Sequence, residues 1–336
     1  MRAVFFETAP WERRYLTRAL TLKGLRVRFS QEPLTEETRQ LAAGVEILSV
    51  FIYSTLTARL LRRLPRVRLI ATRSTGFDHI DLAACRRRHI AVSNVPSYGE
   101  NTVAEHTFAL ILALSRNIHK AYVKTIKGDF SLDGLQGFDL KGKTLGVVGA
   151  GHIGLHVIKM AKGFGMDVLV SDVRKNVFLS EVLDFRYVSL EALLRRSDIV
   201  SLHVPSMPAT HHLMNRQTFQ LMRRGALLIN TARGGLIDTN ALVWALDEGI
   251  VGGAGLDVLE GEELVKEERQ LLSKDFSKEK LATALRNHIL LHRENVVITP
   301  HIAFDSREAL QRILDTTANN IREFIQHTPV NLVRAG

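Results

Sequence analysis

Short apolar runs alternate with longer amphipathic stretches along most of the chain. In the first hundred residues, five apolar runs have the length of strands, and helical patterns such as Leu56–Leu64 lie between them. This βαβ rhythm predicts a parallel sheet covered by helices on both faces. The five expected strands are Val4–Phe6, Val27–Phe29, Ile47–Val50, Val67–Ala71 and Ile90–Val92.

A second series of strands and helices follows a long helical stretch. Residues Thr102–Ser115 are apolar on nearly every side, so this helix is expected to be buried inside the chain or against a second subunit. A charged segment of helical pattern, Glu260–Glu294, precedes the last strand, and Ser306–His327 is predicted as an amphipathic helix. The six strands expected here fit a doubly wound fold: Thr144–Val148, Val168–Val170, Ile199–Leu202, Ala226–Ile229, Gly253–Leu256 and Val296–Ile298.

The turn after the first strand of this series has the spacing of a dinucleotide-binding loop. Gly149, Gly151 and Gly154 form GxGxxG between the strand Thr144–Val148 and the helical pattern Leu155–Phe164. The first glycine allows a tight turn, the second lets the backbone approach a pyrophosphate, and the third lets the helix pack close to the sheet. The N-terminus of the helix would present N–H groups and the positive end of its dipole to the phosphates.

Asp172 ends the next strand, about 20 residues after the glycines, as this kind of site requires. A carboxylate there accepts hydrogen bonds from ribose hydroxyls and repels a 2′-phosphate, which favours NAD over NADP. Arg174 and Lys175 follow closely and could receive a phosphate, so some use of NADP stays open.

Residues with suitable chemistry follow the later strands. Ligands of open α/β sheets bind outside the carboxyl ends of the strands, so Arg233, Asp257, Glu262 and His301 are expected to converge beside the cofactor. A guanidinium can clamp the carboxylate of a 2-oxo acid and polarise its ketone oxygen. A histidine can protonate that oxygen, and a neighbouring carboxylate would orient the imidazole and favour its protonated form. This chemistry needs no metal.

Each of these residues also has a purely structural interpretation. His301 taken alone could be a hydrogen-bonded core histidine, and Arg233 could cap a turn. Glu262 lies in an acidic run, Glu260–Glu263, which is typical of a solvated face. Their joint position at strand ends favours the functional interpretation of the set.

At these positions the sequence resembles the D-isomer-specific 2-hydroxyacid dehydrogenase family over nearly its whole length. The resemblance rests on the glycine loop and on the runs Asn230–Asp238, Gly255–Val258 and Thr299–His301. It implies that Arg233, Glu262 and His301 are catalytic, with Glu262 hydrogen-bonded to His301. It implies NAD as the cofactor, with Thr231, Ala232 and Asp257 at its nicotinamide end and Val204 and Pro205 beside the adenosine. The implied cofactor-binding residues are Gly149, Gly151, His152, Ile153, Gly154, Asp172, Val204, Pro205, Thr231, Ala232 and Asp257.

Within the family the chain is most similar to the D-lactate dehydrogenase group. The run Arg73–Asp81 matches a loop whose Thr75 and Gly76 N–H groups would meet the substrate carboxylate, and Tyr98 would face the substrate together with Arg233 and His301. The implied reaction is the NADH-dependent reduction of a small, pyruvate-like 2-oxo acid to the D-2-hydroxy acid. The run Val103–His106 matches a helix that in the family helps to build the dimer, so the resemblance implies a homodimer.

The resemblance also implies two Rossmann-like, doubly wound parallel-sheet domains in a discontinuous arrangement. Residues 1–100 and 302–336 would form a flavodoxin-like substrate domain, and residues 101–301 an NAD-binding Rossmann domain. The reaction would take place in the cleft between them, whose closure would exclude water.

Composition narrows the class of protein. Hydrophobic residues make up 46% and charged residues 24%, which excludes disorder. Lysine and arginine (45) exceed aspartate and glutamate (35), but the basic residues are spread along the chain, so we expect no nucleic-acid partner. The single cysteine, Cys85, excludes an intrachain disulfide, and no apolar run approaches the roughly 20 residues of a membrane span. We therefore expect a cytoplasmic protein without a membrane partner.

Two other functions stay open. The first is an enzyme of the same family that reduces hydroxypyruvate, glyoxylate or a bulkier 2-oxo acid. The second is an NAD-sensing interaction protein, because the corepressors of this family also keep the three catalytic residues. Comparing turnover across a panel of 2-oxo acids distinguishes the first alternative from a lactate dehydrogenase. Slow turnover with every acid would favour the second alternative.

Overall fold

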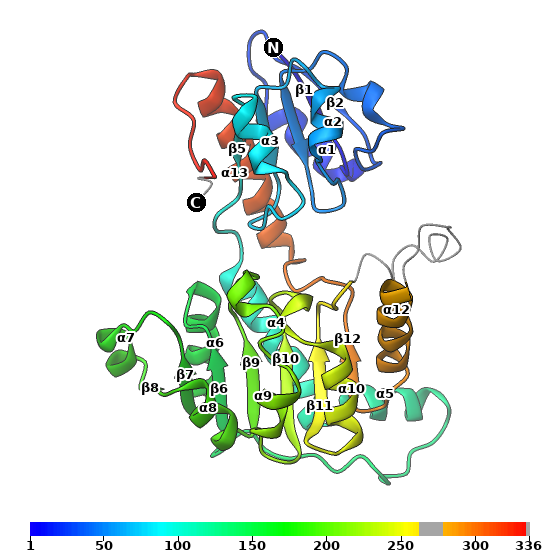
Figure 1. Cartoon of the computed structure of the whole chain (residues 1–336), viewed down its shortest axis with the longest axis vertical. Helices are drawn as coiled ribbons and strands as arrows, with labels where there is room; N and C mark the ends of the chain where they lie inside the picture. Colours follow the sequence, from blue (N-terminus) through cyan, green and yellow to red (C-terminus); the bar gives the residue numbers. More distant parts are fainter. Residues whose placement is uncertain (262–277, 334–336) are drawn as a thin grey trace. The chain divides into compact units, whose positions relative to one another are not determined.

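The chain folds into two compact units (Figure 1). The computed structural model describes residues 1–261 and 278–333. The first unit contains residues 1–99 and 305–336, and the second contains residues 100–304. The chain therefore leaves the first unit once and returns to it with its last helix.

The first unit is built on a five-stranded parallel sheet with the strand order β2-β1-β3-β4-β5. This is the flavodoxin-like doubly wound order. The central strands β3 and β4 are buried at every position, whereas the edge strand β2 alternates between exposed and half-buried residues. The elements of this unit are β1 (Arg2–Phe5), α1 (Pro10–Ala19), β2 (Arg26–Phe29), η1 (Arg39–Ala42), β3 (Ile47–Val50), α2 (Ala58–Arg62), β4 (Leu69–Thr72), α3 (Leu82–Arg87), β5 (Ala91–Ser93) and α13 (Arg307–Ile325).

The C-terminal helix α13 completes the core of the first unit. Its N-cap is Ser306, whose hydroxyl accepts a hydrogen bond from the Ala309 N–H at 3.1 Å. The apolar stripe predicted from the sequence buries Leu314 and Ile321 against residues of α1 and the sheet, and Ile313 of the same helix is also buried. A segment more than 200 residues away in sequence thus covers one face of the first sheet.

The second unit is built on a seven-stranded parallel sheet with the order β12-β11-β10-β9-β6-β7-β8. The order reverses at β6, as in a dinucleotide-binding fold, and the predicted fold class is confirmed. All six predicted strands are present, and β8, only two residues long, was missed. The elements are α4 (Glu100–Ser115), α5 (Ile118–Ile126), β6 (Thr144–Val148), α6 (His152–Gly163), β7 (Asp167–Ser171), α7 (Val177–Val182), β8 (Arg186–Tyr187), α8 (Leu190–Arg196), β9 (Ile199–Leu202), η2 (Pro208–Thr210), α9 (Arg216–Gln220), β10 (Ala226–Asn230), η3 (Gly234–Leu236), α10 (Thr239–Asp247), β11 (Val251–Leu256), α12 (Lys278–Leu291) and β12 (Val296–Ile298).

Helix α4 is buried within the second unit. It packs against α6, β10 and β11, and Leu110 and Leu114 lie so close to Gly253 and Gly255 of β11 that a Cβ on either glycine would be crowded. The sequence left two ways to bury this helix, inside the chain or against a second subunit. The structure shows that the chain itself buries most of it.

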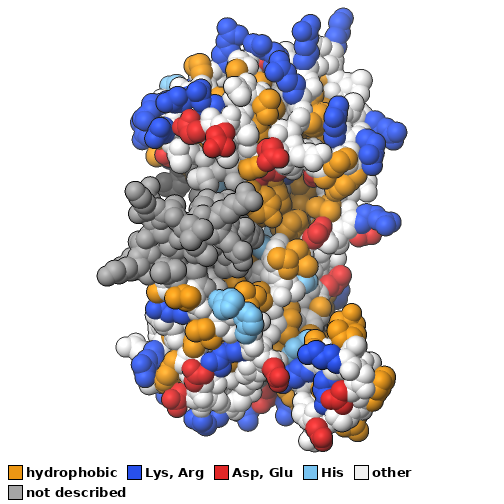
Figure 2. Space-filling model, turned by 90° about the vertical axis from the view of Figure 1, so that its right-hand side faces the viewer, with side chains coloured by type: hydrophobic (Ala, Val, Ile, Leu, Met, Phe, Trp, Pro, Cys, Tyr) orange, Lys and Arg blue, Asp and Glu red, His pale blue; other side chains and the backbone are white. Residues whose placement is uncertain are grey.

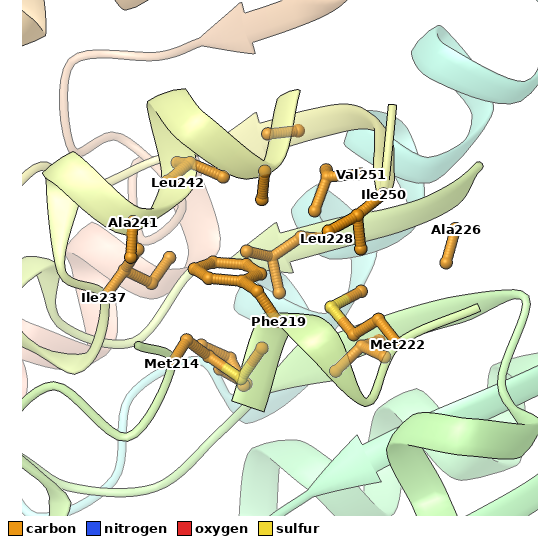
Figure 3. Close-up of a cluster of buried hydrophobic side chains, with 14 of the residues drawn as sticks. Met214, Phe219, Met222, Ala226, Leu228, Ile237, Ala241, Leu242, Ile250 and Val251 are labelled. Atoms are coloured by element: carbon orange, nitrogen blue, oxygen red, sulfur yellow. The ribbon is translucent and has the colours of Figure 1, made fainter. Parts of the chain in front are cut away.

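A second apolar cluster fills the space between the sheet and helices α9 and α10 (Figure 3). Phe219 of α9 lies among Met214, Leu228, Ile237 and Leu242, and all five side chains are buried. Because both faces of the sheet are covered, its strands consist of nearly continuous apolar runs. Most polar residues of this sheet therefore lie at the strand ends, where the candidate site lies.

The charged segment expected at Glu260–Glu294 is helical over α12, and residues 262–277 lie outside the described residues. Among the described residues, no helix is both long and apolar enough to cross a membrane.

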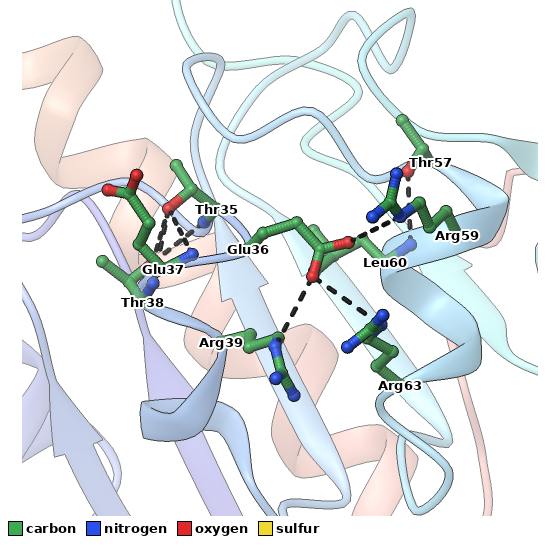
Figure 4. A network of polar contacts seen from close by, with 9 residues as sticks. All are labelled: Thr35, Glu36, Glu37, Thr38, Arg39, Thr57, Arg59, Leu60 and Arg63. Atoms are coloured by element: carbon green, nitrogen blue, oxygen red, sulfur yellow. Dashed lines mark hydrogen bonds and ion pairs between the residues drawn. The ribbon is translucent and has the colours of Figure 1, made fainter.

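The basic residues are divided unevenly between the two units. The first unit carries 21 lysines and arginines against 12 aspartates and glutamates, and the second carries 24 against 23. Many blue side chains are visible on the surface in Figure 2. Glu36 compensates part of this charge, since its carboxylate lies 3.5 Å from Arg39 Nε, 3.5 Å from Arg59 Nε and 3.8 Å from Arg63 Nε (Figure 4). These side chains are 42–72% exposed, so each pair contributes about 0–1 kcal/mol.

Candidate active site

The glycine loop lies between β6 and α6, at the strand-order reversal of the second sheet. Gly149 has φ of 98°, and a Cβ there would lie 2.7 Å from the His203 carbonyl oxygen. A Cβ on Gly154 would lie 2.1 Å from the Gly149 carbonyl oxygen. By contrast, nothing lies within 4 Å of a Cβ on Gly151. Two glycines are thus required by packing, and the middle one faces open space where a pyrophosphate can approach the backbone.

Helix α6 begins at this loop and provides the N-terminal end of a helix dipole. It runs from His152 to Gly163, and Val157, Ile158 and Ala161 hold it against the sheet. His152 is exposed and Ile153 is half-buried at its first turn. The first N–H groups of a helix have no intrahelical acceptor, so the turn that carries these two residues suits an anionic ligand.

Asp172 follows β7 and closes the glycine loop. Its Oδ2 accepts a hydrogen bond from the Ala150 N–H at 2.7 Å, and its Oδ1 accepts one from the Arg174 N–H at 2.7 Å. The carboxylate is therefore held beside the loop, at the place where ribose hydroxyls are expected. Arg174 and Lys175 are exposed. After β9, Val204 is half-buried and Pro205 is exposed.

His203 packs against the glycine loop through its backbone, next to Gly149, and was not predicted as part of the site. Burial lowers the pKa of its imidazole to about 4, so the ring is neutral at physiological pH. Its ring Nε2 lies 2.8 Å from the Ser201 hydroxyl, and its backbone N–H donates to the Val148 carbonyl at 2.7 Å. An uncharged histidine there adds no positive charge beneath the loop.

Asn230, the last residue of β10, shapes the turn that carries Arg233. Its Oδ1 accepts a hydrogen bond from the Ala232 N–H at 3.0 Å, and its Nδ2 donates to the Arg233 carbonyl at 2.9 Å. The hydroxyl of Thr231 lies 2.9 Å from that of Thr107 in α4. The Arg233 guanidinium donates through Nη1 to the Ala232 carbonyl at 2.8 Å. The buried amide of Asn230 therefore fixes the backbone on both sides of Ala232.

Asp257 holds the loop of His301. Its carboxylate accepts hydrogen bonds from the Thr299 hydroxyl (2.5 Å), the Ile302 N–H (2.9 Å) and the Ala303 N–H (2.9 Å). The His301 N–H donates to the Asp257 carbonyl at 2.9 Å, and His301 has φ of 58°. Asp257 is expected from the resemblance to line the nicotinamide end, and in the structure its carboxylate accepts hydrogen bonds from this loop. These bonds hold His301 in a left-handed backbone conformation that most residues avoid.

His106 is a further partner of this cluster that the sequence did not indicate. Its Nε2 lies 3.0 Å from the Thr299 hydroxyl and 3.5 Å from Asp257 Oδ1. Burial alone raises the pKa of Asp257, but the hydrogen bonds from His106, Thr299 and the 302–303 backbone outweigh it and lower the pKa below its ordinary value. Asp257 is thus ionised at physiological pH although its side chain is buried.

The Arg233 turn and the His301 loop are joined through Asp257. The Asp257 N–H donates to the Asn230 carbonyl at 2.9 Å, where β10 and β11 pair. The structure therefore brings the predicted residues Arg233, Asp257 and His301 to the carboxyl ends of three neighbouring strands. Glu262, the third expected catalytic residue, lies outside the described residues.

The loop expected to meet the substrate carboxylate lies in the first unit, after β4. The Thr75 hydroxyl donates to the Val95 carbonyl at 2.8 Å, and the Thr75 carbonyl accepts from Asn94 Nδ2 at 2.8 Å. The Ser74 hydroxyl donates to the Gly76 carbonyl at 2.6 Å. Beneath the loop, buried Arg73 donates to the carbonyls of Phe6 and Glu7, both at 2.7 Å. Tyr98 is half-buried, and its carbonyl accepts a hydrogen bond from Arg312.

No three histidine, cysteine, aspartate or glutamate side chains lie close enough together to hold a metal ion within residues 1–261 and 278–333.

Replacing Asp257 by alanine is expected to destabilise the second unit by roughly 3 kcal/mol or more, because two buried N–H groups and a hydroxyl lose their acceptor. Chemical denaturation of both proteins measures this difference. Since the pKa of Asp257 is lowered in the folded state, its contribution is complete above the ordinary value near 3.8 and is lost as pH falls through the lower folded value. An unfolding free energy that is the same for both proteins at pH 7 would contradict the assignment.

The fold and this site define a class, the NAD-dependent oxidoreductases with a doubly wound cofactor domain. Residues 108–303 match the model of the family described as "D-isomer specific 2-hydroxyacid dehydrogenase, NAD binding domain". A D-lactate dehydrogenase of Curvularia clavata is 38% identical over 335 residues, covering 98% of this chain and 94% of that protein.

Solved structures give the same result. The D-lactate dehydrogenase of Aquifex aeolicus, complexed with NAD and lactic acid, has a TM-score of 0.86 and 38% identity over 97% of this chain and 96% of that one. The pyruvate reductase of Chlamydomonas reinhardtii has a TM-score of 0.87 and 36% identity over 98% of each chain. The chain therefore belongs to the D-isomer-specific 2-hydroxyacid dehydrogenase family. It is an NAD-dependent D-2-hydroxyacid oxidoreductase.

Proposed function

We propose that this enzyme is a D-lactate dehydrogenase, which reduces a small pyruvate-like 2-oxo acid with NADH to the D-2-hydroxy acid. The observation that carries the proposal is the connection of the Arg233 turn to the His301 loop through Asp257. It provides a cation and a proton donor on neighbouring strand ends. The relatives named as D-lactate dehydrogenases and as a pyruvate reductase support the choice of substrate.

In this proposal Arg233 binds the substrate carboxylate and polarises the ketone oxygen. A guanidinium can donate two parallel hydrogen bonds to a carboxylate, which fixes the orientation of the substrate as well as its position. His301 gives a proton to the ketone oxygen and takes it back in the reverse direction. Glu262 orients His301 and stabilises its protonated form.

NAD supplies the hydride acceptor and donor when it is bound. The residues proposed to hold it fit the loop geometry, because Gly151 faces open space and Asp172 is fixed beside the loop. His152 and Ile153 would provide N–H groups for the pyrophosphate, and Asp172 would bind the ribose hydroxyls. The roles expected for Val204, Pro205, Thr231, Ala232 and Asp257 at the two ends of the cofactor stay predictions. So do the substrate contacts expected for Thr75, Gly76 and Tyr98.

The test of this proposal is the consumption of NADH by the purified protein with pyruvate, followed by a chiral assay of the product. Fast turnover to D-lactate supports the proposal. A panel with glyoxylate, hydroxypyruvate and branched 2-oxo acids, run with NADH and NADPH, identifies the alternatives. A higher kcat/KM for one of those acids overturns the lactate assignment and keeps the enzyme class. Very slow turnover with every acid favours an NAD-sensing interaction protein.

We also propose a cytoplasmic homodimer, with α5 rather than α4 as its main contact. Helix α4 is mostly covered by the chain itself, whereas α5 and the segment after it expose several large apolar side chains. Monomeric proteins rarely expose a large apolar patch of this kind. The exposed side chains are Ile118 (54%), Tyr122 (67%), Val123 (45%), Ile126 (64%), Phe130 (78%) and Leu132 (83%).

Light scattering of the protein eluted from a size-exclusion column should therefore give twice the mass of one chain. The double variant Ile126→Glu, Phe130→Asp should give the mass of a monomer. The matched control is Phe178→Asp in α7, an exposed phenylalanine outside the proposed contact. A wild-type monomer at micromolar concentration, or a dimer unaffected by the paired substitution, would refute this contact.

A further inference from the structure

The segment after β11 lies directly against the turn that carries Arg233. A Cβ on Gly234 would lie 2.1 Å from the Leu259 carbonyl oxygen and 2.5 Å from the Glu260 nitrogen. The two backbones are therefore in contact with no room for a side chain between them. The position of the residue after Arg233 depends on where residues 259–260 lie.

The side chain of Glu260 is held from two sides. Its Oε1 lies 2.5 Å from His212 Nε2, and its Oε2 accepts hydrogen bonds from the Thr239 hydroxyl at 2.8 Å and the Thr239 N–H at 3.2 Å. Its backbone carbonyl accepts a hydrogen bond from Asn287 Nδ2 of α12 at 2.9 Å. Glu260 is therefore anchored to three segments of the second unit. A solvated acidic residue would have no such set of partners.

The partners of Glu260 flank the Arg233 turn on both sides. The His212 N–H donates to the Gly235 carbonyl at 2.9 Å, and Met214 forms a parallel bridge with Ile237. Thr239 begins α10, directly after this turn. Glu260 thus contacts the Arg233 turn in two ways. Its backbone lies against Gly234, and its carboxylate is bonded to His212 and Thr239, which lie on either side of the turn.

We propose that Glu260 is a positioning residue for the oxo-acid substrate, and that it acts by fixing the turn that carries Arg233. The inference rests on the proposed function, in which Arg233 clamps the substrate carboxylate. A bidentate clamp tolerates little displacement, since a shift of about 1 Å in a positioning group can lower the rate by about 10²-fold. Burial raises the pKa of Glu260, but its bonds with His212 and Thr239 outweigh burial and lower the pKa, so the carboxylate is ionised at physiological pH.

The experiment compares Glu260→Gln, which removes the charge and keeps the shape, with wild type and with Glu181→Gln, an exposed glutamate of α7. Glu260→Gln should raise KM for pyruvate and lower kcat/KM by roughly 10- to 100-fold. Its dissociation constant for NADH, measured by fluorescence, should stay within twofold of wild type. Glu181→Gln should leave all three quantities unchanged.

A double-mutant cycle shows whether Glu260 acts through Arg233. In an Arg233→Ala background, Glu260→Gln should cause little further loss of kcat/KM, because the guanidinium that it positions is gone. An equal loss in both backgrounds would overturn the proposal, and so would a Glu260→Gln enzyme with wild-type kcat/KM. If Arg233→Ala alone keeps wild-type kcat/KM, the proposed function fails instead.

Thr239→Val provides a second variant in case Glu260→Gln does not fold. It removes one hydrogen bond from the Glu260 carboxylate and leaves the charge and His212 in place. It should raise KM for pyruvate severalfold with NADH binding unchanged. A Thr239→Val enzyme that folds and keeps the wild-type KM would count against the proposal.

Discussion

His301→Asn is expected to lower kcat by roughly 10²–10⁴-fold with the affinity for NADH unchanged, because a general acid contributes about this factor. Asparagine is the better replacement than alanine here. His301 has φ of 58°, and asparagine adopts the left-handed region more readily than most residues. The bonds of Asp257 to the 299–303 loop can therefore form, and the loss can be attributed to the imidazole.

Stopped-flow measurement of NADH oxidation with pyruvate gives kcat, and fluorescence titration gives the NADH affinity. His156→Ala, an exposed histidine on α6, serves as the matched control and should keep the wild-type kcat. A variant with near-normal turnover would show that another group provides the proton.

The features predicted best from the sequence are those with a local cause. The glycine loop is one, because the demands of its turn act on three residues within six positions, and the structure shows the close contacts at Gly149 and Gly154. The central strands are another. Three of the predicted ranges coincide with the interior strands β3, β6 and β9, because strands buried on both faces are continuous apolar runs, and a fourth coincides with the edge strand β12. The edge strand β8 has only two residues and leaves no such pattern.

The contacts that the sequence did not indicate join residues far apart in the chain. His106 meets Thr299 across 193 positions, and His212 meets Glu260 across 48. No spacing rule connects such pairs, since their approach depends on the strand order of the sheet. For the same reason the sequence indicated no partner for Glu260, whose acidic run is typical of a solvated face, although its carboxylate is bonded to His212 and Thr239. The burial of α4 was predicted from its composition, but only the sheet shows that β10 and β11 cover it.

Arg233→Lys is expected to lower kcat/KM for pyruvate by about 10²-fold, the usual effect of losing one donor that stabilises developing negative charge. Lysine keeps the positive charge but is a point donor, so it cannot hold the carboxylate with two parallel bonds and also polarise the ketone oxygen. Both KM and kcat should change, since the clamp acts in the bound substrate and in the transition state. The backbone should be unaffected, because Asn230 holds it through the carbonyl of residue 233 and the N–H of Ala232.

Arg195→Lys provides the control, since Arg195 is exposed on α8 and pairs with Glu191 of the same helix. It should keep the wild-type kcat/KM. Arg233→Ala should lose more activity than Arg233→Lys and should regain part of it when guanidinium chloride is added at millimolar concentrations, because a soluble guanidinium can occupy the vacated place. Steady-state kinetics with pyruvate at fixed saturating NADH measure all of these effects. If Arg233→Lys keeps the wild-type kcat and KM, the substrate carboxylate is bound elsewhere. Thr75 and Gly76, whose N–H groups could bind it, are then the first residues to test.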